Sequence, residues 1–517
     1  MSPRLRAALI AAVLVVSSLP IVASAGNQSC ETRNNNTIDK LLECVTVDGV
    51  REHQAALQSI ADANNGIRTA GTEGYNQSAA YVAERLEAAG YDVTLQEFDF
   101  QAFVQLGPST LEQVTPVPTA YLEGTGTGFD YSLMSQTDAG DVTGTIEAVA
   151  LALGGGAWPN DPSTSTSGCD IGDFAGFTPG NVALMQRGAC SFQLKAENAA
   201  ASGAVGAIVF NQGNSPSRMD PISATLGAGY SGGIPAMFGS FARGVEWSST
   251  AGLQMHLVAD VLRGTVPTAN VIAESTSGDP SNVVMAGAHL DSVSQGPGLQ
   301  DNGSGSAALL EVAEQMAKVK PRNKVRFAWW TAEESGLVGS TYYVNSLTAE
   351  EQDDITLYLN FDMIGSPNHV FFVYDGDDSD GVGAGPGPEG SAQIEEFYEN
   401  YYDGLGLPHK GTDFSGRSDY GPFIAVGIPS GGLFTGAEGI KTPDEAALWG
   451  GTAGDQYDPC YHLACDTFDN ISLTALDVNS DAVAASVLTF AMNTEDINGE
   501  RGKGNFKPEN RDFDPTS

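Results

Sequence analysis

The residues best suited to chemistry stand at the ends of three apolar segments. The segment VVMAGAHLD ends in His289 and Asp291, VRFAWWTAEE ends in Glu333 and Glu334, and LYLNFDM ends around Asp362. In an open α/β sheet, ligands bind just beyond the carboxyl ends of the strands. Imidazole nitrogen and carboxylate oxygen are donors that Zn²⁺ takes in proteins. The three segments therefore predict a metal site at one edge of a sheet.

Two further residues join this set from outside the apolar segments. Asp301 in GLQDNGSGS directly precedes an expected helix, where an acid is also favoured by the helix dipole alone. His462 lies in DPCYHLACD, and a disulfide between Cys460 and Cys465 would stiffen its loop, although a lone histidine is more often an ordinary surface residue. The remaining histidines have no strand-end carboxylate near them in sequence: His53, His256, His369 and His409.

Two histidines and three carboxylates are more than one catalytic zinc needs. They suit a pair of ions about 3.5–4 Å apart that share one carboxylate. Asp291 follows His289 by two residues and fits an outer partner that holds the other imidazole N–H. Adjacent Glu333 and Glu334 point in different directions at a strand end, so one can face an ion and the other the attacking water. Nearby cations would offset the repulsion between them.

Alternating strands and helices must position these residues. The segment SGSAALLEVAEQMAKV predicts a helix with Leu309, Val312, Ala313 and Met316 on one face. After Thr268 the pattern predicts an α/β domain with a mixed, mostly parallel sheet flanked by helices.

A helix–strand unit is also expected near the N-terminus. The segment SAAYVAERLEAAGYDVTLQEFDF predicts a helix capped by Ser78 and ended by Gly90, followed by a strand. It predicts that the α/β domain begins here and is completed only after a long intervening segment.

The intervening residues differ in composition from both flanks. They are rich in Gly, Thr, Ser and Pro, carry short apolar strands such as NVALM, GAIVF and IPAMF, and lack acid–histidine clusters. The segment therefore reads as a β-rich insertion into a split domain. The expected organisation is a signal peptide at 1–25, a linker or pro-segment at 26–45, the first part of the α/β domain at 46–102, the insertion at 103–265, the second part at 266–494 and a polar tail at 495–517.

The N-terminus and the charge limit location and partners. Arg4 and Arg6 precede an apolar run that ends in Ala23-Ser24-Ala25, which is typical of a cleaved secretory signal, and the run is too short for a membrane anchor. A net charge of −40 argues against nucleic acid and anionic membranes as partners.

Export would permit disulfides, and the six cysteines fall into sequence-local pairs. Six cysteines allow 15 connectivities. We expect the pairs Cys30–Cys44, Cys169–Cys190 and Cys460–Cys465. Metal binding by these thiols is less favoured because no two are spaced C-x-x-C.

Five motifs together resemble one family. GAHLDSV, DNGSG, WWTAEESGLVGS, NFDMIG and DPCYHLACDT resemble the M28 di-zinc aminopeptidases, especially secreted bacterial leucine-type enzymes, over about residues 50–100 and 268–490. The resemblance implies a zinc exopeptidase-like fold. GNVALMQRGACSFQLKAENAAASGAVGAIVFNQ resembles a protease-associated (PA) domain, for which a substrate-access or interaction role is expected.

The resemblance also implies a role for each residue. One zinc would be bound by His289 and Glu334, and the other by Asp362 and His462, with Asp301 as the bridge. Glu333 matches the general base, Tyr461 a group that polarises the carbonyl or stabilises the oxyanion, and Arg417 a basic residue near substrate; Met363 and Phe434 match walls of an apolar pocket. Some bacterial members carry a structural Ca²⁺, whose ligands would fall at Asp477 and Asp481, although this i, i+4 pair also fits solvated helix acids.

The expected protein is a secreted or periplasmic, monomeric zinc aminopeptidase. It would act on peptides with a free N-terminus and a large apolar first residue, and use neither nucleic acid nor, after signal cleavage, a membrane. A carboxypeptidase or dipeptidase would need basic residues for a free carboxylate, of which mainly Arg417 is evident. A non-catalytic binding protein is disfavoured because every expected ligand position is filled.

Overall fold

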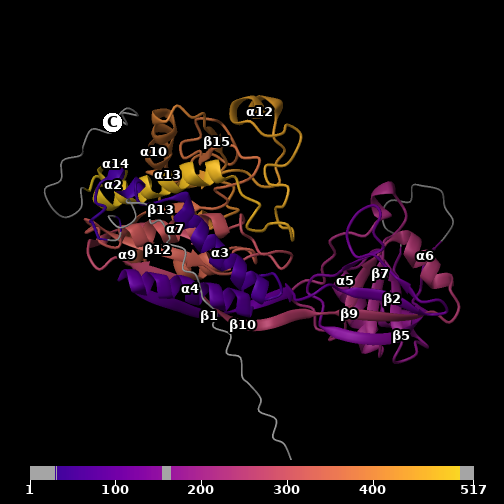
Figure 1. The fold of residues 1–517 in the computed structure, drawn as a ribbon. Coiled ribbons are helices and arrows are strands. Elements are labelled where there is room, and N and C mark those ends of the chain that lie inside the picture. The colour runs from indigo at the N-terminus through magenta and orange to yellow at the C-terminus, as the bar shows by residue number, and fades with distance from the viewer. Residues whose placement is uncertain (1–29, 31, 154–164, 501–517) are drawn as a thin grey trace, which may run out of the picture.

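The chain forms two lobes joined by a long two-stranded ribbon (Figure 1). The computed structural model describes residue 30 and residues 32–153 and 165–500. The expected signal peptide, residues 1–25, lies outside the described residues, as do residues 501–517 of the expected tail.

An eight-stranded mixed sheet forms the centre of the larger lobe. Its strands, in spatial order, are β1 (Asp92–Gln105), β10 (Val261–Glu274), β12 (Asn323–Trp330), β11 (Asp279–His289), β13 (Ile355–Phe361), β16 (Ser430–Phe434), β14 (Phe372–Tyr374) and β15 (Lys410–Thr412). β11 pairs in parallel with both β12 and β13, and β13 pairs in parallel with β16. The antiparallel pairs are β1–β10, β10–β12 and β14–β16. The expected sheet type is confirmed.

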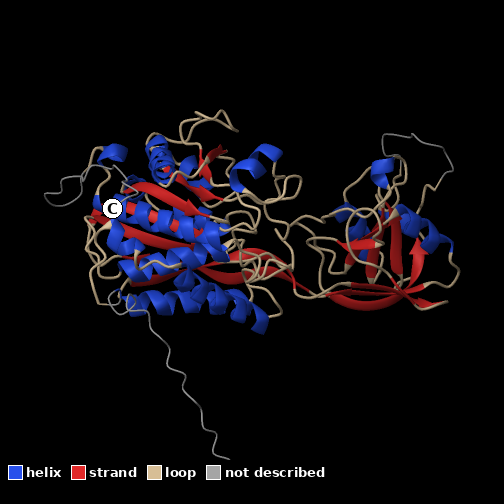
Figure 2. Ribbon diagram, turned by 45° about the horizontal axis from the view of Figure 1, so that its top comes forward, coloured by secondary structure: helices blue, strands red, loops and turns tan. Residues whose placement is uncertain are grey.

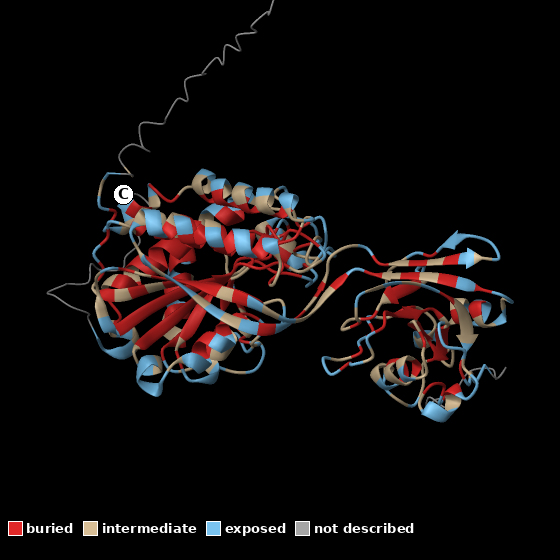
Figure 3. Ribbon diagram, turned by 90° about the horizontal axis from the view of Figure 1, so that it is seen from below, coloured by how far each residue is buried: buried red, intermediate tan, exposed pale blue. Residues whose placement is uncertain are grey.

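Helices cover both faces of this sheet because its central strands are apolar on both sides. Val284 and Ala286 of β11 face one core cluster, whereas Val283 and Met285 face another. The first face is covered by α2 (Ile38–Leu42), α3 (Val47–Ala63), α4 (Glu73–Ala89), α7 (Gly303–Met316), α10 (Ser391–Gly404) and α13 (Leu473–Met492), and the second by α8 (Val338–Ser346) and α11 (Tyr420–Ala425). Shorter helices lie at the periphery: α9 (Ala349–Asp353), α12 (Pro443–Trp449) and α14 (Glu495–Asn498). The strands lie between these helix layers (Figure 2) and are largely buried (Figure 3).

Helix α4 begins earlier than the sequence suggested. Its N-cap is Thr72, whose side chain accepts from the N–H of Tyr75, so the prediction of Ser78 was wrong. Ser78 is buried inside the helix, and its hydroxyl donates to the carbonyl of Gly74 at 2.8 Å. The helix ends at Gly90, which has a φ of 96° and can adopt this left-handed conformation because it lacks a Cβ.

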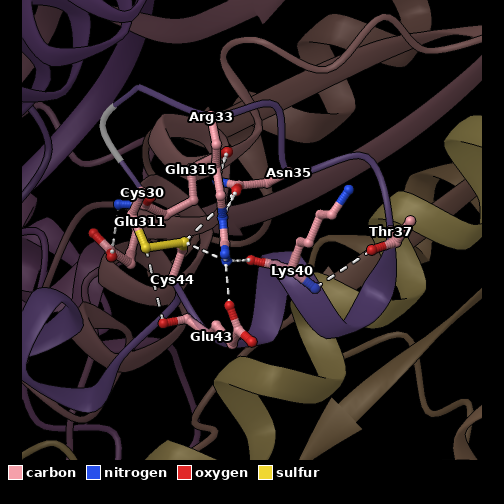
Figure 4. The surroundings of a disulfide bond; sticks show 9 residues. All are labelled: Cys30, Arg33, Asn35, Thr37, Lys40, Glu43, Cys44, Glu311 and Gln315. Carbon is pink, nitrogen blue, oxygen red and sulfur yellow. Dashed lines mark hydrogen bonds and ion pairs between the residues drawn. A yellow bond between two sulfur atoms is a disulfide. The ribbon is translucent and has the colours of Figure 1, made fainter. Parts of the chain in front are cut away.

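The segment expected as a linker or pro-segment is packed onto the larger lobe where it is described. Leu41 and Val45 belong to the main core cluster. The side-chain amide of Asn35 donates to the carbonyl of Gln315 in α7 at 2.9 Å, close to the Cys30–Cys44 disulfide (Figure 4). The buried apolar side chains explain why this stretch is held in place instead of forming a free linker.

The smaller lobe is built on a second eight-stranded sheet with its own core. The strands, in spatial order, are β3 (Thr119–Ala120), β2 (Thr110–Thr115), β9 (Gln254–Ala259), β5 (Gly140–Ala148), β6 (Val182–Gln186), β7 (Gly206–Phe210), β8 (Ala236–Gly239) and β4 (Tyr131–Leu133). Helices α5 (Phe192–Ala201) and α6 (Phe241–Ser249) and the 3₁₀ helices η1 (Ile171–Phe174) and η2 (Pro216–Arg218) complete it. Two core clusters lie wholly within these residues, which confirms a separate β-rich insertion.

The ribbon that joins the lobes is the paired β1 and β10. Their register runs from Asp92 opposite Glu274 to Gln105 opposite Val261. The expected boundaries at 102/103 and 265/266 therefore fall inside these strands. β10 is antiparallel to β12, with Glu274 opposite Arg326 and Val271 opposite Trp329. The ribbon consequently leaves the sheet on the side where β12 ends, so the insertion extends from the same edge as the expected metal site.

All three expected disulfides are present: Cys30–Cys44, Cys169–Cys190 and Cys460–Cys465. Sequence-local pairing therefore selected the right connectivity. Among the helices in the described parts of the chain, none combines the length and the hydropathy needed to cross a bilayer.

Candidate metal centre

The parallel strands bring the predicted ligands to one edge of the central sheet. His289 is the last residue of β11, and Asp362 follows the last residue of β13. Glu334 lies four residues beyond the end of β12. Asp301 directly precedes Asn302, the N-cap of α7. The connection between α12 and α13 supplies His462.

Three of these residues form a first donor group. Nε2 of His289 lies 3.2 Å from Oδ1 of Asp301 and 3.3 Å from Oδ1 of Asp362. Zinc–ligand bonds of about 2.0–2.1 Å place neighbouring donors of a tetrahedron about 3.3 Å apart. The observed spacings match the edges of such a polyhedron.

A second donor group shares Asp301 with the first. Nε2 of His462 lies 3.1 Å from Oδ2 of Asp301 and 3.2 Å from Oε2 of Glu334. Asp301 thus turns one oxygen towards each histidine, as a bridging carboxylate must.

This grouping corrects the pairing that the sequence suggested. His289 lies with Asp362 rather than with Glu334, and Glu334 lies with His462. The reason is the turn after β12, where Ala332 has a φ of 53° and the chain leaves the strand direction. This turn carries Glu334 away from the neighbouring end of β11 and towards the His462 loop.

Buried oxygens without partners show that the donor set fits cations. Oδ1 of Asp362 and Oε1 of Glu334 are buried and accept no hydrogen bond from the described residues. A buried charged oxygen left in this way is costly unless a cation compensates it. Imidazole and carboxylate together suit zinc in particular.

The electrostatics of the centre lead to the same conclusion. Burial, with Asp301 adding to it, raises the pKa of Glu334 to about 7. Burial opposes charge on His462 too, but its contacts with Asp301 and Glu334 raise the pKa of His462 to about 10. Burial also works against ionisation of Asp301, but both histidines outweigh it and lower the pKa of that carboxyl. The site thus favours positive charge between its carboxylates.

Glu333 lies beside both groups without belonging to either. Its Oε2 is 4.0 Å from Nε2 of His289, and its backbone N–H donates to Oδ1 of Asp291 at 3.1 Å. Burial raises the pKa of Glu333, and Asp419, Glu334 and Asp362 raise it further while His289 lowers it. A carboxylate with a raised pKa next to the metal positions is suited to move a proton.

Asp291 holds this arrangement differently from the prediction. Nδ1 of His289 lies 3.2 Å from the backbone carbonyl oxygen of Asp291 and 3.7 Å from its Oδ1. The shorter contact is therefore to the backbone, whereas the prediction gave this role to the side chain. The Asp291 side chain also ties the loop after β11 to Glu333, and its own hold on the imidazole stays a prediction.

Two residues that sequence reasoning missed position the Asp301 loop. Asp466 is buried and accepts from the backbone N–H groups of Gln300 at 2.8 Å and Asp301 at 3.0 Å. Arg68 is fully buried and donates to the carbonyls of Pro297 at 2.9 Å, of Gly298 at 2.7 Å and of Leu290. Asp466 lies within the motif DPCYHLACDT and could have been selected from it, whereas Arg68 lies in none of the quoted motifs.

Residues around Asp362 were also missed. The hydroxyl of Ser418 donates to Oδ2 of Asp362 at 2.5 Å and thereby fixes which oxygen faces His289. Asp419 is buried with both oxygens unpartnered among the described side chains and backbone, and burial raises its pKa to about 7. Both residues lie in the motif FSGRSDYGPF, from which only Arg417 was selected.

Tyr461 and Arg417 flank the second donor group. The rings of Tyr461 and His462 stack with centroids 3.8 Å apart. Arg417 is 64% exposed and its Nη1 lies 2.8 Å from Oε1 of Glu438. Glu438 and, more weakly, Tyr461 raise the pKa of Arg417. Both predicted residues therefore lie beside the centre.

The expected pocket residues are held close to it by backbone contacts. The N–H of Met363 donates to Oδ1 of Asn302 at 3.1 Å, and its carbonyl accepts from the N–H of Thr435 at 2.9 Å. Phe434, directly before Thr435, stacks on Phe372 with centroids 5.9 Å apart. That Met363 and Phe434 line a substrate pocket stays a prediction.

The calcium prediction has weaker support. Asp477 and Asp481 lie on α13, and burial followed by the charge of Asp477 raises the pKa of Asp481 to about 7. Neither residue is in a group of three potential ligands within the described residues.

The chain is similar to known proteins over most of its length. The model of peptidase family M28 matches residues 270–487, and that of the PA domain matches residues 144–247. An aminopeptidase of Pseudomonas aeruginosa is 49% identical over 472 residues, which cover 91% of this chain and 86% of the relative. Leucine aminopeptidase 2 of Trichophyton equinum is 46% identical over 330 residues, covering 63% of this chain and 65% of that protein. BSAP, a zinc aminopeptidase of Bacillus subtilis, shares the fold with a TM-score of 0.56 at 24% identity, over 86% of this chain and 94% of its own.

Proposed function

Because the chain belongs to peptidase family M28 and is a metallo-aminopeptidase with an inserted PA domain, we propose that its centre holds two zinc ions. The observation that carries this proposal is Asp301, whose two oxygens face two different histidines at 3.2 Å and 3.1 Å. One ion would be held by His289, Asp301 and Asp362, and the other by Asp301, Glu334 and His462. Zinc ions bound here would polarise the scissile carbonyl. They would also lower the pKa of a water molecule, so that it can give up a proton and attack the carbonyl.

The protein's own residues then carry the proton and hold the substrate. Glu333 takes a proton from the attacking water and returns it to the amine that leaves. Tyr461, next to His462, donates to the oxygen that becomes negative on the carbonyl. The carboxylates of the centre attract the free ammonium group of the substrate.

Arg417 supports removal of residues from the N-terminus rather than the C-terminus. An enzyme that captures a free carboxylate needs an uncompensated cation, but Arg417 is paired with Glu438 at 2.8 Å. We propose large apolar first residues such as leucine as substrates, with Met363 and Phe434 lining the pocket. The name of the Trichophyton equinum relative, a leucine aminopeptidase, agrees with this preference.

We also propose that the protein is exported and acts as a monomer. The sequence of residues 1–25 supports export, as do three disulfides, which persist in oxidising compartments.

Replacement of the two adjacent glutamates separates proton transfer from metal binding. Glu333→Gln should keep bound zinc and lower kcat by about 10²- to 10⁴-fold because the base is lost. Glu334→Ala should lose zinc because a ligand is removed. Zinc content by elemental analysis and hydrolysis of leucine p-nitroanilide measure the two effects. Near-normal kcat in Glu333→Gln would refute the assignment of the base.

The substrate class needs a separate measurement. N-acetyl-leucine p-nitroanilide should be inert, since it lacks the free ammonium group, whereas leucine p-nitroanilide should be hydrolysed. Efficient cleavage of the blocked compound would contradict aminopeptidase specificity.

A further inference from the structure

A second group of potential ligands lies outside the catalytic centre, among three helices of the larger lobe. It consists of His53 on α3 and Glu311 and Glu314 on α7. The two glutamates are three residues apart and so lie on one face of α7. His53 lies far from any strand-end carboxylate in the sequence and meets these two glutamates because α3 packs against α7.

The distances within this group are too long for hydrogen bonds. Nε2 of His53 lies 3.5 Å from Oε2 of Glu311 and 3.8 Å from Oε2 of Glu314. Hydrogen bonds between nitrogen and oxygen are about 2.7–3.2 Å long. Donors around one zinc ion are about 3.3 Å apart, given bonds of about 2.0–2.1 Å. The first spacing is close to that separation and the second is slightly longer.

His53 presents a buried nitrogen that has no partner. The side chain is 1% exposed, and Nε2 makes no hydrogen bond to any described residue. Its other nitrogen, Nδ1, lies 2.8 Å from the hydroxyl of Tyr81 on α4. With the proton on Nδ1, the lone pair of Nε2 points between the two carboxylates. An outer hydrogen bond of this kind commonly orients a metal-binding histidine.

Arg85 already compensates the charge of Glu314, whereas no arginine or lysine among the described residues is paired with Glu311. Arg85 on α4 forms a bidentate pair with Glu314, at 2.5 Å from Nε to Oε1 and 2.7 Å from Nη2 to Oε2. Glu311 is 7% exposed in its side chain, and the one side-chain hydrogen bond given to it by the described residues comes from the amide of Gln315, at 3.1 Å on Oε1. One buried carboxylate therefore lacks a compensating charge, and its Oε2 is the atom that faces His53.

A second acidic group in the described part of the chain differs from the group around His53. Asp375, Asp377 and Glu395 also lie together, but their oxygens are used by the loop that carries them. Asp375 and Asp377 accept from the N–H of Ser379 at 2.9 Å and 2.8 Å, and Glu395 accepts from the N–H of Gly376 at 2.8 Å. Turn formation accounts for that group without a ligand.

We propose that His53, Glu311 and Glu314 form a third metal site, which binds a first-row divalent cation such as Zn²⁺. One imidazole and two carboxylates suit zinc, whereas calcium prefers oxygen ligands alone. Water completes the coordination. The ion ties α3 to α7 and takes no part in the reaction.

Zinc titration of the full-length, chelator-treated protein tests this site. Wild type should bind one equivalent more than His53→Gln, as measured by elemental analysis after gel filtration. Glu311→Gln should lose the same equivalent while keeping its shape and its bond with Gln315. His53→Gln reloaded with zinc should hydrolyse leucine p-nitroanilide at the wild-type rate.

The chain offers a matched control in His256. It also stands between two carboxylates, but at 2.9 Å from Glu112 and 2.7 Å from Asp141, which are hydrogen-bond distances. His256→Gln should bind as much zinc as wild type. Equal zinc content in wild type, His53→Gln and Glu311→Gln would overturn the proposal. Asp301→Asn distinguishes this site from the catalytic centre. It should lower the number of zinc ions bound at the centre and leave the one equivalent bound at His53 in place.

Discussion

Asp301 turns one carboxylate oxygen towards each of two histidines. A single side chain can do this only if its surroundings fix the positions of both oxygens. Its oxygens face His289 and His462, and its backbone is held by Asp466 from the His462 loop. The residue shared by the two donor groups is therefore also the residue through which the two halves of the centre are aligned.

Replacement of Asp466 tests this alignment. In Asp466→Asn the side-chain NH₂ would face one of the backbone N–H groups of Gln300 and Asp301, and neither N–H has another hydrogen bond within the described residues. We expect zinc affinity to fall by about 10- to 100-fold, as for other outer residues of metal sites. Competition with a chromogenic chelator measures it. The exposed neighbour Asp469→Asn is the control, and an unchanged affinity in Asp466→Asn would show that the loop is held by other contacts.

Single residues also show how far the sequence could predict the centre. His289 and Asp362 were found because each ends or directly follows a buried apolar strand. The distribution of the ligands between the two donor groups was not found, because it depends on the turn at Ala332 and on contacts with the His462 loop, which lies more than 100 residues further along the chain. Ser418 and Asp466 were missed because hydrogen bonds to ligands leave no periodic pattern.

The loop between β11 and α7 is the element on which the centre depends most. It carries no regular structure from Leu290 to Asp301 and is closed by Arg68, which comes from the connection between α3 and α4. Helix α7 can start so close to β13 because Gly305 stands there: a Cβ at this position would lie 2.1 Å from the carbonyl oxygen of Phe361. The start of α7 and the end of β13 are thereby fixed relative to each other, and with them Asp301 and Asp362.

Arg68→Lys should disturb this loop while leaving the sheet intact. A lysine cannot reach three carbonyls in the way that the planar guanidinium does. We expect a fall in zinc affinity of about tenfold or more, because the ligands lose their fixed positions. Circular dichroism should remain unchanged.

Arg218→Lys, in the insertion, is the matched control for that change. Arg218 contacts Gln212 and none of the residues of the centre. If both variants bound zinc as tightly as wild type, the hydrogen bonds of the Arg68 guanidinium would not be needed to hold the loop.

Within the insertion, His256 joins three strands. It lies on β9 and contacts Glu112 on β2 and Asp141 on β5. The hydrogen bonds with Glu112 and Asp141 raise the pKa of His256. A raised folded-state pKa stabilises the fold at pH values below the unfolded pKa of about 6.5, and this stabilisation is lost as the pH rises through the folded value.

The lobe should consequently be more stable in mildly acidic than in alkaline solution. The pairs are partly exposed, so the effect should not exceed about 1 kcal/mol. Urea unfolding of wild type and His256→Gln should differ at about pH 5.5 and converge at about pH 9. A difference that grows with pH would contradict the assigned role.

The whole molecule consists of a catalytic lobe and an insertion with separate cores. The expected boundaries fall inside β1 and β10, because these two strands continue without interruption through both positions. The two lobes share this ribbon, so the sequence shows no sharp break between them. Their main hydrophobic clusters are nevertheless made of different residues.

Removal of the insertion should therefore leave an active lobe. Gln105 and Val261 are paired, so a two-residue Asn-Gly turn between them would close β1 and β10 into a hairpin. We expect a soluble protein that hydrolyses leucine p-nitroanilide within an order of magnitude of wild type. Its hydrolysis of longer peptides should change, since the insertion extends from the edge where the centre lies. Loss of bound zinc would show that the catalytic lobe needs the insertion to fold.

The ligands are widely spaced along the chain, which decides when during synthesis the centre can be completed. The centre takes its ligands from His289 through His462, so a growing polypeptide has no complete centre until that last histidine has been synthesised. His462 lies within the short loop closed by Cys460 and Cys465, and such a bond persists only in an oxidising compartment. If the protein is exported as proposed, the disulfide that closes the His462 loop would therefore form only after the chain has left the reducing cell interior.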